Sequence, residues 1–530
     1  MKQHTVEELN TLSKEEMVAL VMQLQRQNAL FAEQLATMQS QRFGRKTERL
    51  SEIAGQTSVF NEPEAEAEKD SDEPETSESE PEEISCTRNR KKPGKLDEML
   101  KNLPTRKERH ELSEEELIAV FGENGWKRLP DEVYRKLEYH PATKEVVEHH
   151  VAVYASRKED RIVRAPHPAA LLAHSVATPS LVAAVMNAKY TNAMPLYRVA
   201  QEFERYDVKI PVPTLANWVI RCAERYFYPV TDRLQAELRR LPVVQADETV
   251  VKVSKDGRPA HAESRMFVYR SGEFEEKCIV LYDYRKTRGS EHVEEFLGDF
   301  SGTLVTDAFS GYHAVDSRCE GIRLAHCWAH ARRSFADAVK IMKQKGGPSK
   351  QSVKKSIAYQ ALERISSIYA LEDGWKELSP EERLSRRREQ SRPLVEAYFS
   401  WVKEIDPATV VSENTRKGLM YSVNQEKYLK VFLEDGRVPI DNSASERTIR
   451  PFCVGRANWH IIDSVNGAKA SAAVYSIVET AKANRLKPYE YLRHLLIEMP
   501  KHMDDSDFSF LDELLPWSKA LPDVCRKPIT

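Results

Sequence analysis

Three acidic residues stand where a metal-dependent phosphoryl-transfer site would need them. Asp247 lies inside one apolar run, Asp307 ends another, and Glu446 follows a short polar stretch. A carboxylate among apolar residues is costly to bury unless it is paired or binds a cation. Mg²⁺ uses few protein carboxylates and keeps waters and phosphate oxygens as its other ligands. We therefore predict that these acids hold two Mg²⁺ or Mn²⁺ ions, which would activate an attacking oxygen and neutralise the leaving one.

Spacing alone leaves other acids open as candidates. Asp283, Asp299 and Glu248 lie near the chosen residues, and Asp and Glu are common in any chain. The choice therefore depends on the elements that position each carboxylate.

Four strands and one helix are predicted around the first two acids. The strands are Leu241–Val253, Arg265–Arg270, Lys277–Tyr284 and Gly302–Asp307, and the helix is Gly289–Leu297. Their alternating or continuous apolar residues, many of them β-branched or aromatic, are typical of strands. Three antiparallel strands, a helix and a further strand form the beginning of a ribonuclease-H-like sheet. The first and fourth strands of such a sheet are neighbours, which would bring Asp247 and Asp307 together.

A helix that begins near Asn442 is predicted to carry Glu446, with Asn442 or Ser443 as its N-cap. The preceding stretch, from Ala325 to Glu434, is helical and charge-rich and contains no clear strand. A second helix is predicted over Ala468–Ala483. We therefore expect the sheet domain to be interrupted by a long helical insertion.

His326, Cys327 and His330 are predicted to lie on one helix, at positions i, i+1 and i+4. The two histidines would then share a face that could bind a metal. No nearby Cys pair completes a tetrahedral set, so we favour packing and support of the active site.

Arg447, Arg450 and Arg456 cluster around Glu446. They form a solvated basic face, pairs with local acids, or contacts to nucleic-acid phosphates, and we favour phosphate contacts because the guanidinium fork matches phosphate geometry. Trp459 is either a stacking platform for an unpaired base or a buried residue. For Trp459 we favour burial.

Three helices are predicted before the sheet, over Ser180–Lys189, Pro195–Tyr206 and Pro213–Tyr228. The polar and β-branched turn between the last two suits a helix-turn-helix, whose second helix enters the major groove of DNA. Asn217 and Arg221 would then contact DNA. A helical bundle without a DNA-reading role is the alternative.

The N-terminus carries a heptad pattern behind a capping box that runs from Ser13 to Glu16. The seam positions are Met17, Val21, Leu24, Asn28, Phe31, Leu35 and Met38. Because a buried Asn28 can fix the pairing of two helices, we predict that this helix forms a homo-oligomer. Packing of the helix on the chain's own body is the alternative. The basic motif that follows contributes Arg45 and Lys46 as predicted DNA contacts.

The composition indicates a multidomain protein of a reducing cytoplasm. The 530 residues exceed one compact core, and the seven cysteines form no Cys-x-x-Cys pair. No apolar run approaches the roughly 18–20 residues of a membrane span, and no signal peptide is evident, so no membrane partner is expected. From Glu62 to Glu83, 12 acids and one lysine give a local charge of −11, so the rest of the chain carries +8 of the total of −3. The acidic stretch is predicted to be an unstructured linker, and the basic remainder permits a polyanionic partner.

Ordered motifs over nearly the whole chain resemble the large transposase of the insertion-sequence-66 family, a bacterial group with a DDE-type catalytic core. They are Phe43–Leu50, Lys189–Tyr190, Met194–Arg198, Leu215–Val219, Asp247–Thr249, Thr306–Tyr312, His326–Phe335, Asn442–Trp459 and Asp512–Trp517. The resemblance implies that Asp247, Asp307 and Glu446 are the catalytic acids. It also implies strand cleavage and transfer between the element's terminal inverted repeats and target DNA, near the nucleoid, together with two small companion proteins.

One departure from the family concerns zinc. The family usually carries a Cys-based zinc module before the helix-turn-helix, and Leu103–Ala165 contains no Cys here. We therefore expect no structural zinc. Two alternatives to a transposase stay open: a catalytically inactive DNA-binding regulator of the element, and a ribonuclease-H-like nuclease. The intact acids argue against the first, and the heptad helix argues against the second.

The expected fold is a multidomain α/β protein with a ribonuclease-H-like mixed-sheet core, a helical insertion, an N-terminal coiled-coil helix and a helix-turn-helix-like helical domain. The predicted boundaries are 1–50 (heptad helix and basic motif), 51–102 (acidic then basic linker), 103–170 (small mixed domain), 171–238 (helical domain), 239–341 (core, first part), 342–435 (helical insertion), 436–500 (core, second part with Glu446) and 501–530 (C-terminal tail).

Overall fold

The computed structural model describes residues 13–14, 16–18, 20–24, 31, 115, 145–148, 150, 152–155, 162–164, 170–259, 262–343, 350–503, 505 and 507–528. Several residues with predicted roles lie outside these ranges, namely Asn28, Leu35, Met38, Arg45, Lys46, the acidic linker and nearly all of Leu103–Ala165. The chain divides into two compact units, Met1–Phe60 with Ala169–Lys527, and Asn61–Pro168 with Pro528–Thr530.

The strands of the described chain are β1 (Val153–Ala155), β2 (Ile162–Arg164), β3 (Val243–Val251), β4 (Val253–Lys255), β5 (Ser264–Ser271), β6 (Val280–Arg285), β7 (Gly302–Thr306), β8 (Ile322–His326) and β9 (Ile462–Ser464). The α-helices before Glu446 are α6 (Pro179–Met186), α7 (Leu196–Glu204), α8 (Val212–Cys222), α9 (Tyr228–Arg239), α10 (Ser290–Leu297), α11 (Ser310–Arg318), α12 (Trp328–Met342), α13 (Lys350–Lys354), α14 (Ile357–Asp373), α15 (Pro380–Arg386), α16 (Arg392–Glu404) and α17 (Glu413–Leu429). The later ones are α18 (Ser443–Trp459), α19 (Val465–Ala483), α20 (Pro488–Glu498) and α21 (Leu511–Leu514). The described chain also contains short π-helical turns, η1 (Asn187–Thr191), η2 (Ala223–Phe227) and η3 (Arg387–Ser391). It contains 3₁₀ turns as well, η4 (Pro407–Thr409), η5 (Val431–Leu433), η6 (Met499–His502) and η7 (Asp523–Cys525).

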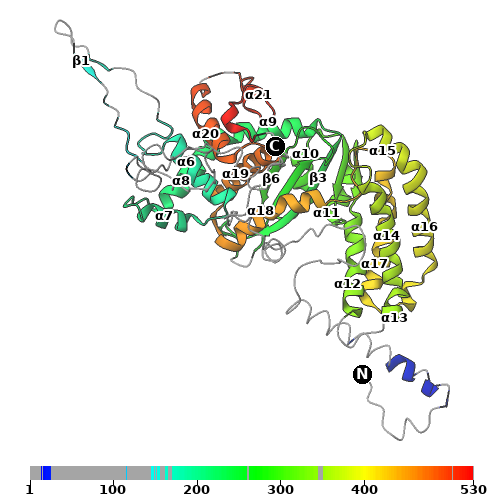
Figure 1. Ribbon diagram of the computed structural model, residues 1–530. Coiled ribbons are helices and arrows are strands. Elements are labelled where there is room, and N and C mark those ends of the chain that lie inside the picture. The colour runs from blue at the N-terminus through cyan, green and yellow to red at the C-terminus, as the bar shows by residue number, and fades with distance from the viewer. Residues whose placement is uncertain are drawn as a thin grey trace. The chain divides into compact units, whose positions relative to one another are not determined.

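The central feature of the larger unit is a mixed sheet of five strands in the order β6-β5-β3-β7-β8 (Figure 1). β3, β5 and β6 pair antiparallel, whereas β3, β7 and β8 pair parallel. The four predicted strands and the predicted helix before β7 are therefore confirmed, and so is the adjacency of the first and fourth strands. The fifth strand, β8, was not predicted, because its last residues were assigned to a helical stretch.

Two helices from the later part of the chain pack on the sheet. α18 packs on β3 and β5, and α19 packs on β6. Alanines on α19 allow this close approach, and the hydroxyls of Ser476 and Thr480 accept hydrogen bonds from the backbone N–H groups of Tyr282 and Val280 at 2.8 and 3.0 Å. These bonds satisfy two groups of the outer edge of β6, which would otherwise be open.

The predicted helical insertion is confirmed between β8 and α18. Its helices α12, α14, α16 and α17 lie side by side (Figure 1) and share one apolar core. Val243, Val305 and Ala325, from three strands of the sheet, belong to the same core. The insertion is therefore packed on the sheet rather than merely connected to it.

The three predicted helices before the sheet are present as α6, α7 and α8. On α8, Leu215, Trp218 and Val219 are buried, whereas Asn217 and Arg221 are exposed. The two exposed side chains stand one turn apart on the outer face of the helix. This arrangement is compatible with groove reading, which stays a prediction.

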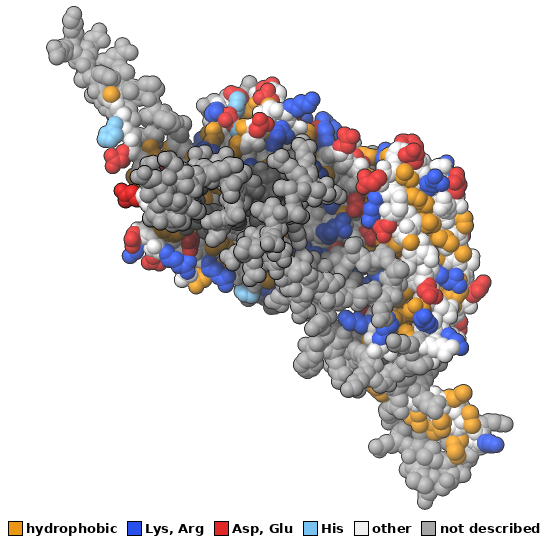
Figure 2. All heavy atoms as spheres, viewed as in Figure 1, with side chains coloured by type: hydrophobic (Ala, Val, Ile, Leu, Met, Phe, Trp, Pro, Cys, Tyr) orange, Lys and Arg blue, Asp and Glu red, His pale blue; other side chains and the backbone are white. Residues whose placement is uncertain are grey.

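The capping box at the N-terminus is confirmed. Ser13 Oγ accepts from the Glu16 backbone N–H at 3.2 Å, and Glu16 Oε2 accepts from the Ser13 N–H at 2.9 Å. The described seam residues Met17, Val21, Leu24 and Phe31 are exposed, and Figure 2 shows hydrophobic side chains on this segment. A coiled coil stays a prediction.

The smaller unit contains the antiparallel pair β1 and β2. Residues 145–148 have no regular structure. Among the residues described, no helix is long and apolar enough to cross a membrane.

Candidate active site

Strand pairing places the first two acids side by side. In the parallel pair of β3 and β7, Gln245 lies opposite Val305. Continuing this register by two residues places Asp247 opposite Asp307, which directly follows β7. Neighbouring strands lie about 4.8 Å apart, and residues two positions apart point to the same face. The two carboxylates therefore belong to one row at the end of β7.

The face of that row is the one covered by α18. Asp247 pairs across the sheet with Val268, which pairs with Tyr282. Tyr282 donates from its hydroxyl to the carbonyl of Thr448 in α18 at 2.6 Å. Glu446 stands in the first turn of the same helix, where the helix dipole favours a negative charge.

Asn442 fixes the start of α18 on the strand that carries Asp247. Its side-chain amide donates to the carbonyl of Ala246 at 2.8 Å and accepts from Gln245 Nε2 at 3.2 Å. Asn442 is the N-cap residue of α18, as predicted, but its side chain makes no capping hydrogen bond because it is bound to the strand. Asp441 Oδ1 instead accepts from the Ser443 N–H at 2.9 Å.

Electrostatics supports the grouping of the three acids. Burial raises the pKa of Asp247 to about 8, with further raising contributions from the charges of Glu248, Glu446 and Asp307. A hydrogen bond from the Glu248 N–H to Asp247 Oδ1, 2.8 Å long, opposes this rise of the pKa. Asp247 is thus a desolvated acid that a bound cation would stabilise.

Neither aspartate has a cationic partner in the described part of the chain. Asp307 Oδ1 accepts from the Phe309 N–H, at 3.1 Å. Within the described residues, no group of three or more His, Cys, Asp and Glu side chains is placed to hold one metal ion. Mg²⁺ does not need such a group, because it usually takes one or two carboxylates together with waters and substrate phosphates. The neighbouring oxygen ligands of Asp247 and Asp307 fit that requirement.

The alternative acids are all committed elsewhere. Glu248, whose side chain is 3% exposed, accepts from Arg288 Nε and from the Tyr312 hydroxyl, both at 2.6 Å. The Asp283 carboxylate accepts from Arg285 Nε at 2.7 Å. Asp299 is an exposed residue with its carboxylate 3.9 Å from Arg239 Nη1. The arginine pairings of Glu248 and Asp283 favour Asp247 and Asp307, which have no cationic partner among the described residues, over these two acids.

Arg333 is a residue of this site that sequence reasoning missed. Its Nη2 donates to Glu446 Oε1 at 3.2 Å, and the side chain is 41% exposed. His330 Nε2 lies 3.9 Å from the same carboxylate oxygen. Burial and then the charge of Arg333 lower the pKa of His330, so its ring is neutral near pH 7. Arg333 lies within the His326–Phe335 motif, but the sequence alone does not pair it with Glu446, which is 113 residues away in the chain.

The prediction that His326 and His330 share one helix is wrong. His326 ends β8, Cys327 precedes α12, and only His330 lies on the helix. The His326 ring packs against Tyr428 with centroids 4.5 Å apart, and burial lowers its pKa to about 3. The buried thiol of Cys327 accepts from the Asn442 N–H at 3.1 Å, so it supports the start of α18.

The arginines of α18 have different surroundings. Arg447 is exposed and lies 3.1 Å from Glu273. Arg450 is partly buried on the next turn of the helix. Arg456 Nη1 donates to Thr249 Oγ1 at 2.9 Å and to the carbonyl of Val250, so part of its hydrogen-bonding capacity is used within the protein. Phosphate contact by these three residues stays a prediction.

Trp459, at the end of α18, is half-buried. Its ring meets Phe452 edge-on at 5.5 Å, and the ammonium of Lys189 lies 5.7 Å from its centroid. Burial lowers the pKa of Lys189 to about 8. The ring is therefore held between two elements of the larger unit.

Comparison with known proteins identifies the family. The family model described as "Transposase IS66 family" matches residues 174–470, and that of the "IS66 C-terminal element" matches residues 476–517. The first match spans more than half of the chain, so the chain belongs to the IS66 transposase family. The resemblance inferred from the motifs is confirmed.

Similar proteins occur in Sinorhizobium fredii (strain NBRC 101917 / NGR234). Uncharacterized protein y4jD is 28% identical over 375 residues, which are 69% of this chain and 71% of that protein. Uncharacterized protein y4hP is 27% identical over 399 residues, which are 74% of this chain and 71% of that protein.

Proposed function

We propose that this chain is a DNA transposase that cleaves and joins DNA strands at the ends of a bacterial insertion sequence. Membership of the IS66 family supports a transposase role. The observation that supports the chemistry is the register of β3 with β7, whose continuation brings Asp247 opposite Asp307, together with the contribution of the Glu446 charge to the raised pKa of Asp247. The strand order and directions support a ribonuclease-H-like core.

The reaction consists of two phosphoryl transfers. In the first, water attacks a phosphodiester at the element end, and the bond to the 3′-oxygen breaks to leave a 3′-hydroxyl. In the second, that hydroxyl attacks a phosphodiester of the target DNA and displaces a target 3′-oxygen. Mg²⁺ or Mn²⁺ held by Asp247, Asp307 and Glu446, as a pair of ions, supplies activation of the attacking oxygen and charge neutralisation at the leaving oxygen.

The protein's own residues orient these groups. Asn442 and Cys327 hold the first turn of α18 against β3. Arg333 lies beside Glu446 and is exposed enough to reach a DNA phosphate as well. Asn217 and Arg221 on α8 are proposed to read the terminal inverted repeats, and Arg45, Lys46, Arg447, Arg450 and Arg456 to contact the backbone.

The biological setting follows from the same function. We propose a cytoplasmic protein associated with the nucleoid, assembled as a homo-oligomer through the N-terminal helix and working with two small companion proteins.

The test is cleavage of labelled element ends by the purified full chain in Mg²⁺ or Mn²⁺. Asp247→Asn, Asp307→Asn and Glu446→Gln should each abolish cleavage while end-binding persists. The matched control is Asp299→Asn, an exposed acid eight residues before Asp307 in the chain, which should cleave like the wild type. Strong residual cleavage in any triad variant contradicts the assignment. Binding without cleavage by the wild type favours the inactive regulator.

A further inference from the structure

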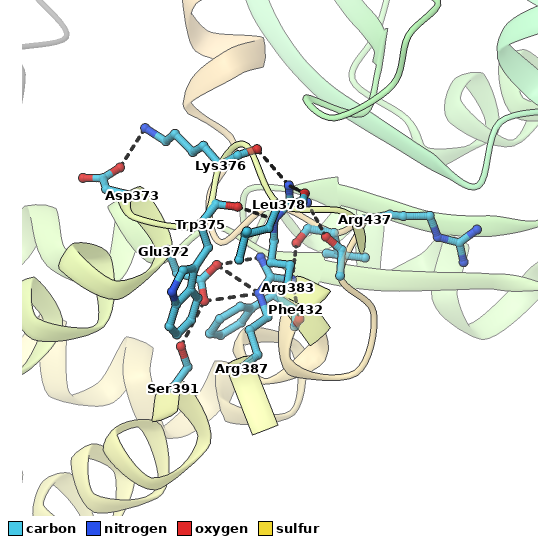
Figure 3. Close-up of polar contacts among 12 residues, drawn as sticks. Glu372, Asp373, Trp375, Lys376, Leu378, Arg383, Arg387, Ser391, Phe432 and Arg437 are labelled. Atoms are coloured by element: carbon cyan, nitrogen blue, oxygen red, sulfur yellow. Dashed lines mark hydrogen bonds and ion pairs between the residues drawn. The ribbon is translucent and has the colours of Figure 1, made fainter. Parts of the chain in front are cut away.

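Two buried arginines of the helical insertion bind one stretch of backbone that leads to Glu446. Arg383, in the last turn of α15, is 2% exposed, and Arg387, one turn later at the start of η3, is 0% exposed. We call residues 430–442, between α17 and α18, the connecting segment. Figure 3 shows both guanidinium groups pointing toward it.

Four backbone carbonyls of the connecting segment accept hydrogen bonds from these two side chains. Arg387 Nη1 donates to the carbonyls of Phe432, Asp435 and Val438 at 2.7, 2.9 and 2.9 Å. Arg383 Nη1 donates to the carbonyl of Gly436 at 2.7 Å. Four carbonyls within seven residues are therefore fixed by two charged groups, and charge-assisted hydrogen bonds of this kind are stronger than neutral ones.

The other donors of the two arginines tie the segment to the insertion itself. Arg387 Nη2 donates to Glu372 Oε2 at 2.6 Å, and the other oxygen of Glu372 accepts from the Ser391 hydroxyl at 3.0 Å. Arg383 Nη2 donates to the carbonyl of Leu378 at 2.7 Å, and its guanidinium stacks 3.5 Å from the ring of Phe274, which belongs to the sheet domain. A buried charge pair contributes little stability compared with apolar packing. Stability alone therefore does not explain why two buried arginines are used at this place.

The far end of the segment is held by the core and not by the arginines. The Trp328 N–H donates to the carbonyl of Ile440 at 3.2 Å, and the Tyr369 hydroxyl donates to Asp441 Oδ2 at 2.8 Å. The Asn442 side chain then donates to the carbonyl of Ala246, the residue before Asp247. Val438 precedes Glu446 by only eight residues, so a displacement there acts directly on the contacts of Ile440, Asp441 and Asn442 that anchor the first turn of α18.

We propose that Arg383 and Arg387 are positioning residues that set the place of Glu446 relative to Asp247 and Asp307. The inference rests on the proposed function, because it takes Glu446 as a metal ligand. The helical insertion then has a defined role: it holds the third acid, which comes from a part of the chain far from the first two. Mg²⁺ demands near-ideal octahedral geometry, so a displaced Glu446 weakens metal binding before it affects DNA binding.

Three variants of the full chain test this proposal. Arg387→Lys and Arg383→Lys keep the charge and lose the planar fork. Gly436→Ala leaves both arginines intact, but its added Cβ would overlap the carbonyl oxygen of Pro380, so the segment must shift. The control is Val402→Ala, which removes buried methyl groups from α16 in the same core and does not touch the segment's carbonyls.

We expect the Mg²⁺ concentration that half-saturates cleavage to rise at least about tenfold, and the concentration that half-saturates the rise in Tm to increase likewise. Losses of metal affinity of this size are typical when a residue that supports a metal ligand is changed. Affinity for element-end DNA should stay unchanged, and hydrogen exchange at residues 440–450 should quicken. In a Glu446→Gln background, adding Arg387→Lys should not reduce the Mg²⁺-induced rise in Tm any further. The Val402→Ala control should lower Tm while its Mg²⁺ dependence stays that of the wild type.

An unchanged Mg²⁺ dependence in all three variants would overturn the inference. A change in Mg²⁺ dependence no larger than the one that Val402→Ala causes would overturn it as well. If the wild type shows no response to Mg²⁺, the proposed function fails by itself. Hydrogen exchange then decides the positioning role, and exchange at residues 440–450 no faster in Arg387→Lys than in Val402→Ala rejects it.

Discussion

Arg333 Nη2 donates to Glu446 Oε1 across 3.2 Å, and the pair joins α12 to α18 at the edge of the candidate active site. The same carboxylate is a proposed metal ligand, so the guanidinium and a cation compete for it. The first prediction follows from this competition. Arg333→Gln should tighten Mg²⁺ binding by a factor of up to about five, the range of an exposed ion pair, while cleavage falls.

The measurement is the Mg²⁺ dependence of Tm, compared with that of Arg493→Gln. Arg493 is similarly exposed and pairs with Glu490 on α20, outside the connecting segment. Weaker Mg²⁺ binding in Arg333→Gln would mean that Arg333 organises Glu446 for the metal instead of competing with it.

A second prediction concerns pH. The pKa of Asp247 is about 8 in the folded chain against a reference value of 3.8. Between these values the folded state holds a proton that the unfolded state has lost, so raising the pH favours unfolding. In metal-free buffer, Asp247→Asn should therefore raise Tm, by a margin that grows from about pH 4 and levels off above pH 8.

Mg²⁺ reverses this trend because it binds the deprotonated carboxylate. Wild-type affinity for Mg²⁺ should increase with pH up to about 8, and Asp247→Asn should lose most of that increase. Parallel Tm profiles of the two proteins across the pH range, with and without Mg²⁺, would refute the assignment of this pKa.

The third prediction separates sequence reading from backbone binding. Asn217→Ala and Arg221→Ala should weaken binding to element ends selectively, by ~1–3 kcal/mol, or roughly ten- to hundredfold. Arg450→Ala should weaken binding to all DNA alike and flatten its salt dependence, because phosphate contacts carry no sequence information. Salt titrations on element-end and random DNA distinguish the two. Equal losses on both DNAs for the α8 variants would exclude α8 as the reader.

The fourth prediction tests the exposed N-terminal seam. Leu24→Glu places a charge at a seam position and should lower the solution mass measured by light scattering. Gln23→Glu, next to it and outside the heptad pattern, should leave the mass unchanged. Deletion of the first 42 residues should have the same effect as Leu24→Glu. An unaltered oligomer in both cases would assign the helix another purpose.

The sequence predicted the sheet well because its strands carry long apolar runs, and Asp247 stands out as a charge inside one of them. It did not reveal β8, because the apolar pattern of Ile322–His326 passes without a turn into the first residues of α12. The cap at Asn442 was assigned by residue type alone. Its actual bond to Ala246 depends on a strand 196 residues away, which no local pattern can show. The buried pairing of Arg387 with Glu372 was hidden for the same reason, since a run of arginines predicts a solvated surface.

The cover that α19 gives to β6 has a consequence during synthesis. The Tyr282 N–H is satisfied by Ser476, which lies 194 residues later in the chain. At roughly 5–20 residues per second, a ribosome needs roughly 10–40 s to produce that cover after the strand itself. During this interval the nascent sheet presents an edge that can pair with another nascent chain. Newly made chains are therefore more prone to edge pairing than mature ones, and slower initiation at lower temperature should increase the yield of folded protein.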